Sequence, residues 1–236
     1  MFSFPPLTPV VKRLIITLFG AFVLELLLEN FAGIPVIKTL AFDPVDLGPL
    51  SLLQLVSYVL IQNPREVMGL MIDLLFMWLI MSPFESAFGR RHTIELAVDG
   101  TLGGSLAAGL VAQVAPLPGW MLLGSHTIAY AGMTAMAQVM GSGRTILLFG
   151  VVPMTSRQLL LVLAGFSFLS FLATRDHLQL ASSLGAMAAG IGYVKYMSRA
   201  PRPSARSKRP STRFRVVRGG GGGGGRDDSD RPKWLN

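Results

Sequence analysis

Three residues of the kinds that catalyse serine hydrolysis, Asp73, His126 and Ser183, each lie in a different apolar stretch of the chain. Such hydrolysis needs a hydroxyl nucleophile, a base within hydrogen-bonding reach and donors for the developing oxyanion. Ser183 would be the nucleophile, His126 the base and Asp73 the group that orients the imidazole, because this kind of site is defined by geometry and not by chain order. The alternative is a polar cluster in which His126 is the partner that an intramembrane Asp73 requires.

Two further acidic residues, Glu95 and Asp99, are four positions apart and share one face of a predicted helix. They could belong to a proton or cation path, which motivates a transporter or channel hypothesis. The ordinary interpretation places Glu95 near the membrane surface beside Arg90 and Arg91, with Asp99 facing polar partners inside the bundle. The three histidines are too dispersed to share a metal ion and the chain has no cysteine, so we expect neither a metal nor a cofactor.

The composition is that of a membrane protein. The chain is 51% hydrophobic and only 14% charged, and its mean hydropathy is +0.52. A span needs about 20 mostly apolar residues and must satisfy its own backbone groups, so the apolar stretches are predicted to be helices. Gly100 and Gly104 predict close helix packing. We expect an all-α, polytopic bundle with six spans, at Leu14–Pro35, Val67–Pro83, Thr93–Ala115, Trp120–Met140, Gln158–Leu172 and Leu178–Met197.

The basic residues predict the orientation, because they concentrate on the cytoplasmic side of a membrane. They precede the first span, lie between the second and third and between the fourth and fifth, and follow the sixth. Both termini are therefore expected in the cytoplasm, with an extracytoplasmic loop insertion, residues 37–66, between the first two spans. Its apolar part, Leu50–Ile61, is too short to span and is expected at the membrane interface. We expect a multi-pass protein of the inner or plasma membrane.

Two parts are predicted, a membrane domain at residues 1–197 and a tail at residues 198–236. The tail is rich in Lys and Arg, and its seven consecutive glycines, Gly219–Gly225, make a flexible linker. This composition predicts disorder and attraction to anionic lipid head groups. Arginines beside a glycine run can also contact RNA, but the position next to the membrane explains the charge, so no nucleic-acid partner is expected.

Several short motifs resemble those of the rhomboid family of intramembrane serine proteases. The turn after the second span reads Glu85-Ser-Ala-Phe-Gly89 and is similar to the family's Glu-x-x-x-Gly. Leu53–Tyr58 resembles the family's Trp-Arg-Leu loop signature with its first two residues altered. The family's second span commonly carries His-x-x-x-Asn, whose side chains help to stabilise the oxyanion. Here the corresponding positions are Gly69 and Asp73, which supply no side-chain donor when the aspartate is ionised.

The two catalytic positions of the family are exchanged in this resemblance. The fourth span carries the family's first glycine, aromatic and small residue, at Gly124, Tyr130 and Ala131. Their spacing places His126 where the family has its nucleophilic serine. In the sixth span, Gly190 matches a glycine of the family's His-x-x-Gly-x-x-x-Gly and places Ser183 where the family has its histidine. The standard Ser/His dyad is therefore absent.

The resemblance implies a six-span rhomboid-like bundle, in a family whose activity is serine-type endopeptidase cleavage inside the membrane. Because nucleophile, base and donors are all changed, the leading hypothesis is a pseudoprotease that binds transmembrane segments of client membrane proteins without cleaving them. An intramembrane serine endopeptidase with a rearranged Asp73, His126 and Ser183 site is one alternative. A transporter or channel is the other.

Overall fold

The computed structural model describes residues 5–64, 67–115, 120–141, 145–148 and 152–199. Helix α9 continues to Arg199, two residues beyond the predicted domain boundary. The rest of the predicted tail, including Gly219–Gly225, lies outside the described residues.

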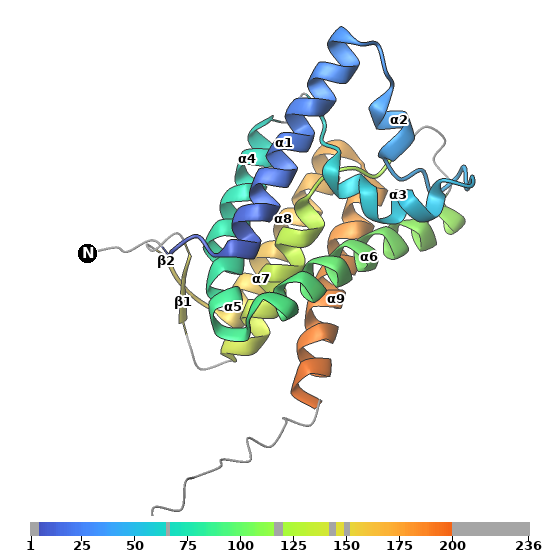
Figure 1. Cartoon of the computed structure of the whole chain (residues 1–236). Helices are drawn as coiled ribbons and strands as arrows, with labels where there is room; N and C mark the ends of the chain where they lie inside the picture. Colours follow the sequence, from blue (N-terminus) through green and yellow to red (C-terminus); the bar gives the residue numbers. More distant parts are fainter. Residues whose placement is uncertain (1–4, 65–66, 116–119, 142–144, 149–151, 200–236) are drawn as a thin grey trace, which may run out of the picture. The chain divides into compact units, whose positions relative to one another are not determined.

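The described residues form a bundle of long helices joined by short helical segments (Figure 1). Pro83 follows a π-helical turn, η2, in the second long helix, where its missing N–H and its ring disfavour regular α-helix geometry. In chain order the elements are α1 (Pro9–Phe31), α2 (Val36–Leu40), α3 (Ser51–Ser57), η1 (Tyr58–Leu60), α4 (Val67–Phe76), η2 (Met77–Met81), α5 (Ser82–Phe88), α6 (Arg90–Val114), α7 (His126–Met140), β1 (Thr145–Leu148), β2 (Val152–Thr155), α8 (Ser156–Thr174) and α9 (His177–Arg199).

Each of the six ranges predicted to be an apolar helix overlaps one of these long helices, although the observed ends differ by up to six residues. Within the described part of the chain, three helices are both long and apolar enough to cross a membrane: Val67–Phe88, Arg90–Val114 and Ser156–Thr174. These helices identify a membrane protein. The last of them, α8, is buried over only 17% of its most apolar window, against 39% for each of the other two, so α8 is the most peripheral of the three.

Two features differ from the fold expected from the sequence. The fourth helix begins at His126 and not at Trp120, because Leu122 exchanges two backbone hydrogen bonds with Phe42, at 2.8 and 3.0 Å. Gly124 follows with φ +110°, which an α-helix does not allow. Between α7 and α8 the backbone forms an antiparallel hairpin of β1 and β2. The fold is therefore mostly helical, and the expectation of an all-α chain was wrong at this connection.

Helices α6, α7 and α9 pack closely because glycines remove the side chains at their contacts. A Cβ atom on Gly100 would lie 2.5 Å from the Cβ of Ala131, and one on Gly103 would lie 2.9 Å from the backbone oxygen of Gly185. A Cβ on Gly190 would lie 2.5 Å from the backbone oxygen of Ala131. Small residues allow such close backbone approach between helices in membranes, and the packing role predicted for Gly100 is found inside the bundle.

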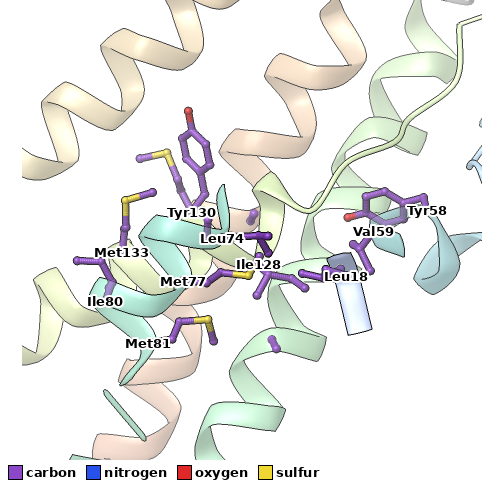
Figure 2. Packing of buried hydrophobic residues seen from close by; sticks show 14 of the residues in the cluster. Leu18, Tyr58, Val59, Leu74, Met77, Ile80, Met81, Ile128, Tyr130 and Met133 are labelled. Carbon is purple, nitrogen blue, oxygen red and sulfur yellow. The ribbon is translucent and has the colours of Figure 1, made fainter. Parts of the chain in front are cut away.

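The hydrophobic core joins the first helix and the loop after it to the centre of the bundle. Figure 2 shows side chains from α1, η1, α4, η2 and α7 meeting there, including Leu18, Tyr58, Val59, Leu74, Met77, Met81 and Ile128. Since lipid is as apolar as these side chains, their contribution within the membrane comes from packing and not from removal of water. The core fixes α4 and α7, which carry Asp73 and His126.

Candidate functional site

A cavity of about 230 Å³ lies between α4, α7, α8 and α9. Asp73 of α4, His126 of α7 and Ser183 of α9 all line it, together with Gly69 and Tyr130. The three side chains singled out from the sequence therefore border one cavity, although they come from helices separated by more than fifty residues. Asp73 is half-buried, whereas His126 and Ser183 are buried.

The hydrogen bond of the imidazole goes to Ser182 and not to Ser183. His126 Nε2 lies 2.9 Å from Ser182 Oγ. The hydroxyls of Ser182 and Ser183 each lie within donating distance of the backbone oxygen of Gln179, at 2.9 and 2.8 Å. Within the described part of the chain, no hydrogen bond joins His126 to Ser183. Ser182 is fully buried and is not part of the cavity wall, so the serine that contacts the base is shielded from the cavity.

The carboxylate of Asp73 is engaged with a different residue. Ser125 Oγ donates to Asp73 Oδ2 at 3.0 Å. No hydrogen bond connects Asp73 to His126 among the described residues, and the nearest aromatic contact of the imidazole is the edge-on ring of Tyr130, at 6.3 Å between centroids and 87°. The polar groups thus form two separate pairs, Ser125 with Asp73 and His126 with Ser182. A relay in which a carboxylate orients the base is not assembled in this arrangement.

Gly124, the motif glycine that precedes α7, connects the site to the loop after α1. The N–H of Gly124 donates to the backbone oxygens of Ile61 and Tyr58, at 2.8 and 3.2 Å. Its positive φ favours glycine, and a Cβ there would lie only 2.9 Å from His126 Nδ1. Gly124 therefore sets the position of the imidazole through the backbone and through the space it leaves open.

The motif residue Glu85 holds the N-terminal end of α1, and Gly89 forms the turn between α5 and α6. The Glu85 carboxylate accepts hydrogen bonds from the N–H groups of Val10, at 3.0 and 3.2 Å, and Val11, at 3.2 Å. Gly89, with φ +88°, ends α5 and begins α6. These residues position helices and do not line the cavity.

Two anchoring residues were not singled out from the sequence as functional. Tyr58 is fully buried, and its hydroxyl lies 2.8 Å from the backbone oxygen of Thr101 and 3.0 Å from Thr127 Oγ1. Burial raises the pKa of this hydroxyl above its ordinary value, so it remains a donor. Glu25 is also buried and accepts a hydrogen bond from the backbone N–H of Gln62 at 3.1 Å. The feature of the sequence that could have revealed Glu25 is an acidic residue inside an otherwise apolar helix.

The three histidines do not converge on one place, and Glu95 and Asp99 have different surroundings. His92 Nδ1 lies 2.7 Å from the Tyr193 hydroxyl, which donates to Glu95 at 2.8 Å. Glu95 also accepts from Arg91, at 2.7 Å, and so lies beside Arg91 as predicted. Asp99 differs from the expectation, because it is exposed on α6 and faces a groove, not the interior of the bundle. The described residues contain no group of three His, Cys, Asp or Glu side chains able to hold a metal ion.

The sequence matches no protein-family model and no curated protein. The interpretation of the cavity therefore depends on its own geometry. That geometry offers hydroxyl groups, three side-chain amides, an imidazole and one carboxylate, enclosed by apolar side chains from four helices. Such a lining can donate hydrogen bonds to a polar group and accept them from it.

Proposed function

We propose that this chain is a rhomboid-like pseudoprotease of six spans, whose cavity binds transmembrane segments of client membrane proteins without cleaving them. The observation that carries the proposal is that Asp73 and His126, which both line the cavity, are each bonded to a different serine and not to each other. His126, which lines the cavity, is bonded to a serine outside the wall, and Ser183, which lines it too, is bonded to its own helix. A nucleophile and a base that face substrate together are missing from this arrangement.

The cavity reaches the lipid-facing surface between α4 and α8. Ile72 of α4 and Phe166 of α8 line the cavity and are also 43% and 63% exposed. A client segment can therefore enter from the side, in the plane of the membrane. Because the cavity is smaller than a helix, which is about 10 Å across, it accommodates one or two side chains while the rest of the client helix lies against the rim.

The polar groups inside the cavity favour clients with a polar or irregular centre. A hydroxyl, amide or free backbone carbonyl in lipid lacks partners, whereas Ser167, Ser170, Gln179 and Ser183 line the cavity and can supply them. A uniformly apolar helix gains no such bonds. Selectivity for destabilised transmembrane segments follows from this difference.

Photo-crosslinking in vesicles tests the binding. Benzoylphenylalanine replaces Phe166 at the cavity, or Phe168, which is 53% exposed on the same helix but outside the cavity wall. The probes are two labelled Leu/Ala transmembrane peptides, one with Asn-Gly at its centre and one without. We expect adducts from position 166 with the Asn-Gly peptide, and few from position 168. Equal yields at both positions, or no preference for the polar peptide, would contradict client binding at this cavity.

The 2.9 Å contact between His126 and Ser182 supports a second candidate, an intramembrane serine endopeptidase. A fluorophosphonate probe distinguishes it, because the probe labels a serine only when that serine is activated and accessible. We expect no labelling of the wild-type protein above that of the Ser182→Ala and Ser183→Ala variants. Labelling that is lost in one of these variants, together with cleavage of the peptide, would replace the binding proposal with the enzyme.

A further inference from the structure

Three side chains in the wall of the client cavity each present a hydrogen-bond acceptor that the bundle does not use. Asp73 accepts the Ser125 hydroxyl through Oδ2, which leaves Oδ1 available. Gln62 lines the cavity although only 6% of it is exposed, and its Oε1 makes no hydrogen bond with the described residues. The third acceptor is Nδ1 of His126, whose role follows from the bonds around the imidazole.

These bonds place the hydrogen of the neutral His126 ring on Nε2. The Ser182 hydroxyl has one hydrogen, and it is donated to the backbone oxygen of Gln179 at 2.9 Å. Ser182 Oγ therefore accepts from His126 Nε2, which lies 2.9 Å away. A neutral imidazole that carries its hydrogen on Nε2 has an unprotonated Nδ1. Nδ1 is thus an acceptor, and no described residue donates to it.

The absent side chain of Gly124 leaves the space that these acceptors border. A Cβ atom there would lie 2.9 Å from His126 Nδ1 and 3.7 Å from Gln62 Oε1, so both atoms approach one point. The amide nitrogen of Gln62 is enclosed by protein, so the oxygen is the amide atom that faces this space. Ser125, which binds the Asp73 carboxylate, is the next residue along the chain. A group that enters beside Gly124 therefore meets acceptors from three segments of the protein.

A primary ammonium group matches this set of acceptors. It has three N–H donors and no acceptor, so it can bond to all three atoms and neutralise the Asp73 carboxylate. A carboxamide has only two N–H donors and leaves the carboxylate charge unpaired, which is costly inside a membrane. The described part of the wall contains no Lys or Arg that could neutralise Asp73 instead.

We propose that the cavity recognises the ammonium group of a lysine in the client's transmembrane segment, through Asp73, His126 and Gln62. The proposal rests on the client-binding function above and names the group that the same cavity selects. The long apolar stem of a lysine can pack against Leu70 and Leu123, which also line the cavity. A lipid ethanolamine presents an ammonium too, but its neighbouring phosphate would meet no cation in the described wall.

Photo-crosslinking in phosphatidylcholine vesicles tests the recognition, with benzoylphenylalanine in place of Phe166. The probes are two labelled Leu/Ala transmembrane peptides with Lys or Gln at the seventh residue, because Asp73 is the seventh residue of α4. The Asn-Gly peptide is used beside them. We expect about tenfold more adduct from the Lys peptide than from the Gln peptide, and Asp73→Asn should remove this preference. The yield of the Asn-Gly peptide should stay, because Ser170 and Gln179 can bond to it.

Two further variants and one spectrum sharpen the test. Asp99→Asn is the matched control, because it removes a carboxylate from a long helix outside the cavity wall, and it should keep the preference. Gln62→Leu removes one neutral acceptor and should lower the preference by about threefold. In the ¹⁵N spectrum of the free protein, His126 should carry its hydrogen on Nε2, and the Nδ1 resonance should shift when the Lys peptide binds. Thermal melts check that each variant is folded.

The outcomes separate this proposal from the function on which it rests. Without adducts from any peptide at position 166, both are wrong. Capture of the Asn-Gly peptide with equal capture of the Lys and Gln peptides leaves client binding intact and overturns lysine recognition. So does a preference that survives Asp73→Asn, or a neutral ring with its hydrogen on Nδ1. If phosphatidylethanolamine in the vesicles abolishes capture of the Lys peptide alone, the acceptors bind a lipid ammonium and the lysine proposal is refuted.

Discussion

The bond between Glu85 and the first turn of α1 makes a quantitative prediction about stability. The first helical residue is Pro9, which has no N–H, and the N–H of Lys12 already donates to the backbone oxygen of Thr8 at 2.8 Å. The free donors are therefore those of Val10 and Val11, and both are taken by the Glu85 carboxylate. A side chain from the end of the second long helix thus performs the capping that a residue next to the helix usually performs.

Glu85→Gln keeps the shape of this cap and removes its charge. Hydrogen bonds to a charged group contribute about 1.5–3 kcal/mol each, against about 0.5–1.5 kcal/mol for neutral ones, so two donors lose about 1 kcal/mol each. Loss of a negative charge at a helix N-terminus adds about 0.3–1 kcal/mol. We expect the free energy of unfolding to fall by about 2–3 kcal/mol. For a chain of this size the melting temperature should drop by about 4–12 °C.

Thr8→Ala is the matched control. Threonine before the first helical turn normally caps it, and its replacement by alanine typically costs about 0.5–2 kcal/mol. Here the Thr8 hydroxyl is buried and makes no hydrogen bond within the described structure, so the change should cost almost nothing. Thermal unfolding in detergent and hydrogen exchange at Val10 and Val11 measure both effects. The reasoning is refuted if Thr8→Ala costs as much as Glu85→Gln, or if Glu85→Gln changes stability by less than about 0.5 kcal/mol.

Three further predictions concern the anchor, the packing and the topology. Tyr58→Phe should lower the free energy of unfolding by about 1–3 kcal/mol, because the buried hydrogen bonds to Thr101 and Thr127 are both lost; an unchanged midpoint in denaturant would contradict the anchoring role. Gly190→Ala should destabilise by about 1–3 kcal/mol through overlap with the α7 backbone, whereas Gly192→Ala should stabilise by up to about 1 kcal/mol through helix propensity. Equal melting temperatures would refute the packing argument. With six spans, an impermeant maleimide should label Gly48→Cys on intact cells and Ser198→Cys only after permeabilisation; labelling of both on intact cells would rule out that topology.

The helices were predictable because length and apolarity decide them locally, whereas their ends depended on distant partners. The start of α7 was misplaced by six residues, since the backbone of Leu122 pairs with Phe42, eighty residues away. The hairpin after α7 was missed for a different reason. Neither of its strands is long enough to show a recognisable alternating pattern.

The gathering of Asp73, His126 and Ser183 at one cavity was predictable from motif spacing, but their hydrogen bonds were not. Ser125 lies inside the range predicted to be the fourth span, so a position within a helix was expected for it. It is instead the residue before α7, with φ −83° and ψ −2°, so its hydroxyl reaches Asp73. The imidazole of His126 is longer than the side chain expected at its position and extends to Ser182. The imidazole contacts Ser182, outside the cavity wall, and not its neighbour Ser183, inside it. This choice of serine decides between a catalytic pair and a structural one.

The distance in sequence between Glu85 and α1 has a consequence for biosynthesis. Val10 and Glu85 are 75 residues apart, and synthesis proceeds at roughly 5–20 residues per second. The first N–H groups of α1 therefore wait about 4–15 s for the carboxylate that will accept them. During that interval α1 lacks its permanent cap, and its first turn is free to move. The Glu85 carboxylate becomes available only after the second long helix has been synthesised. The first two long helices therefore reach their final structure together.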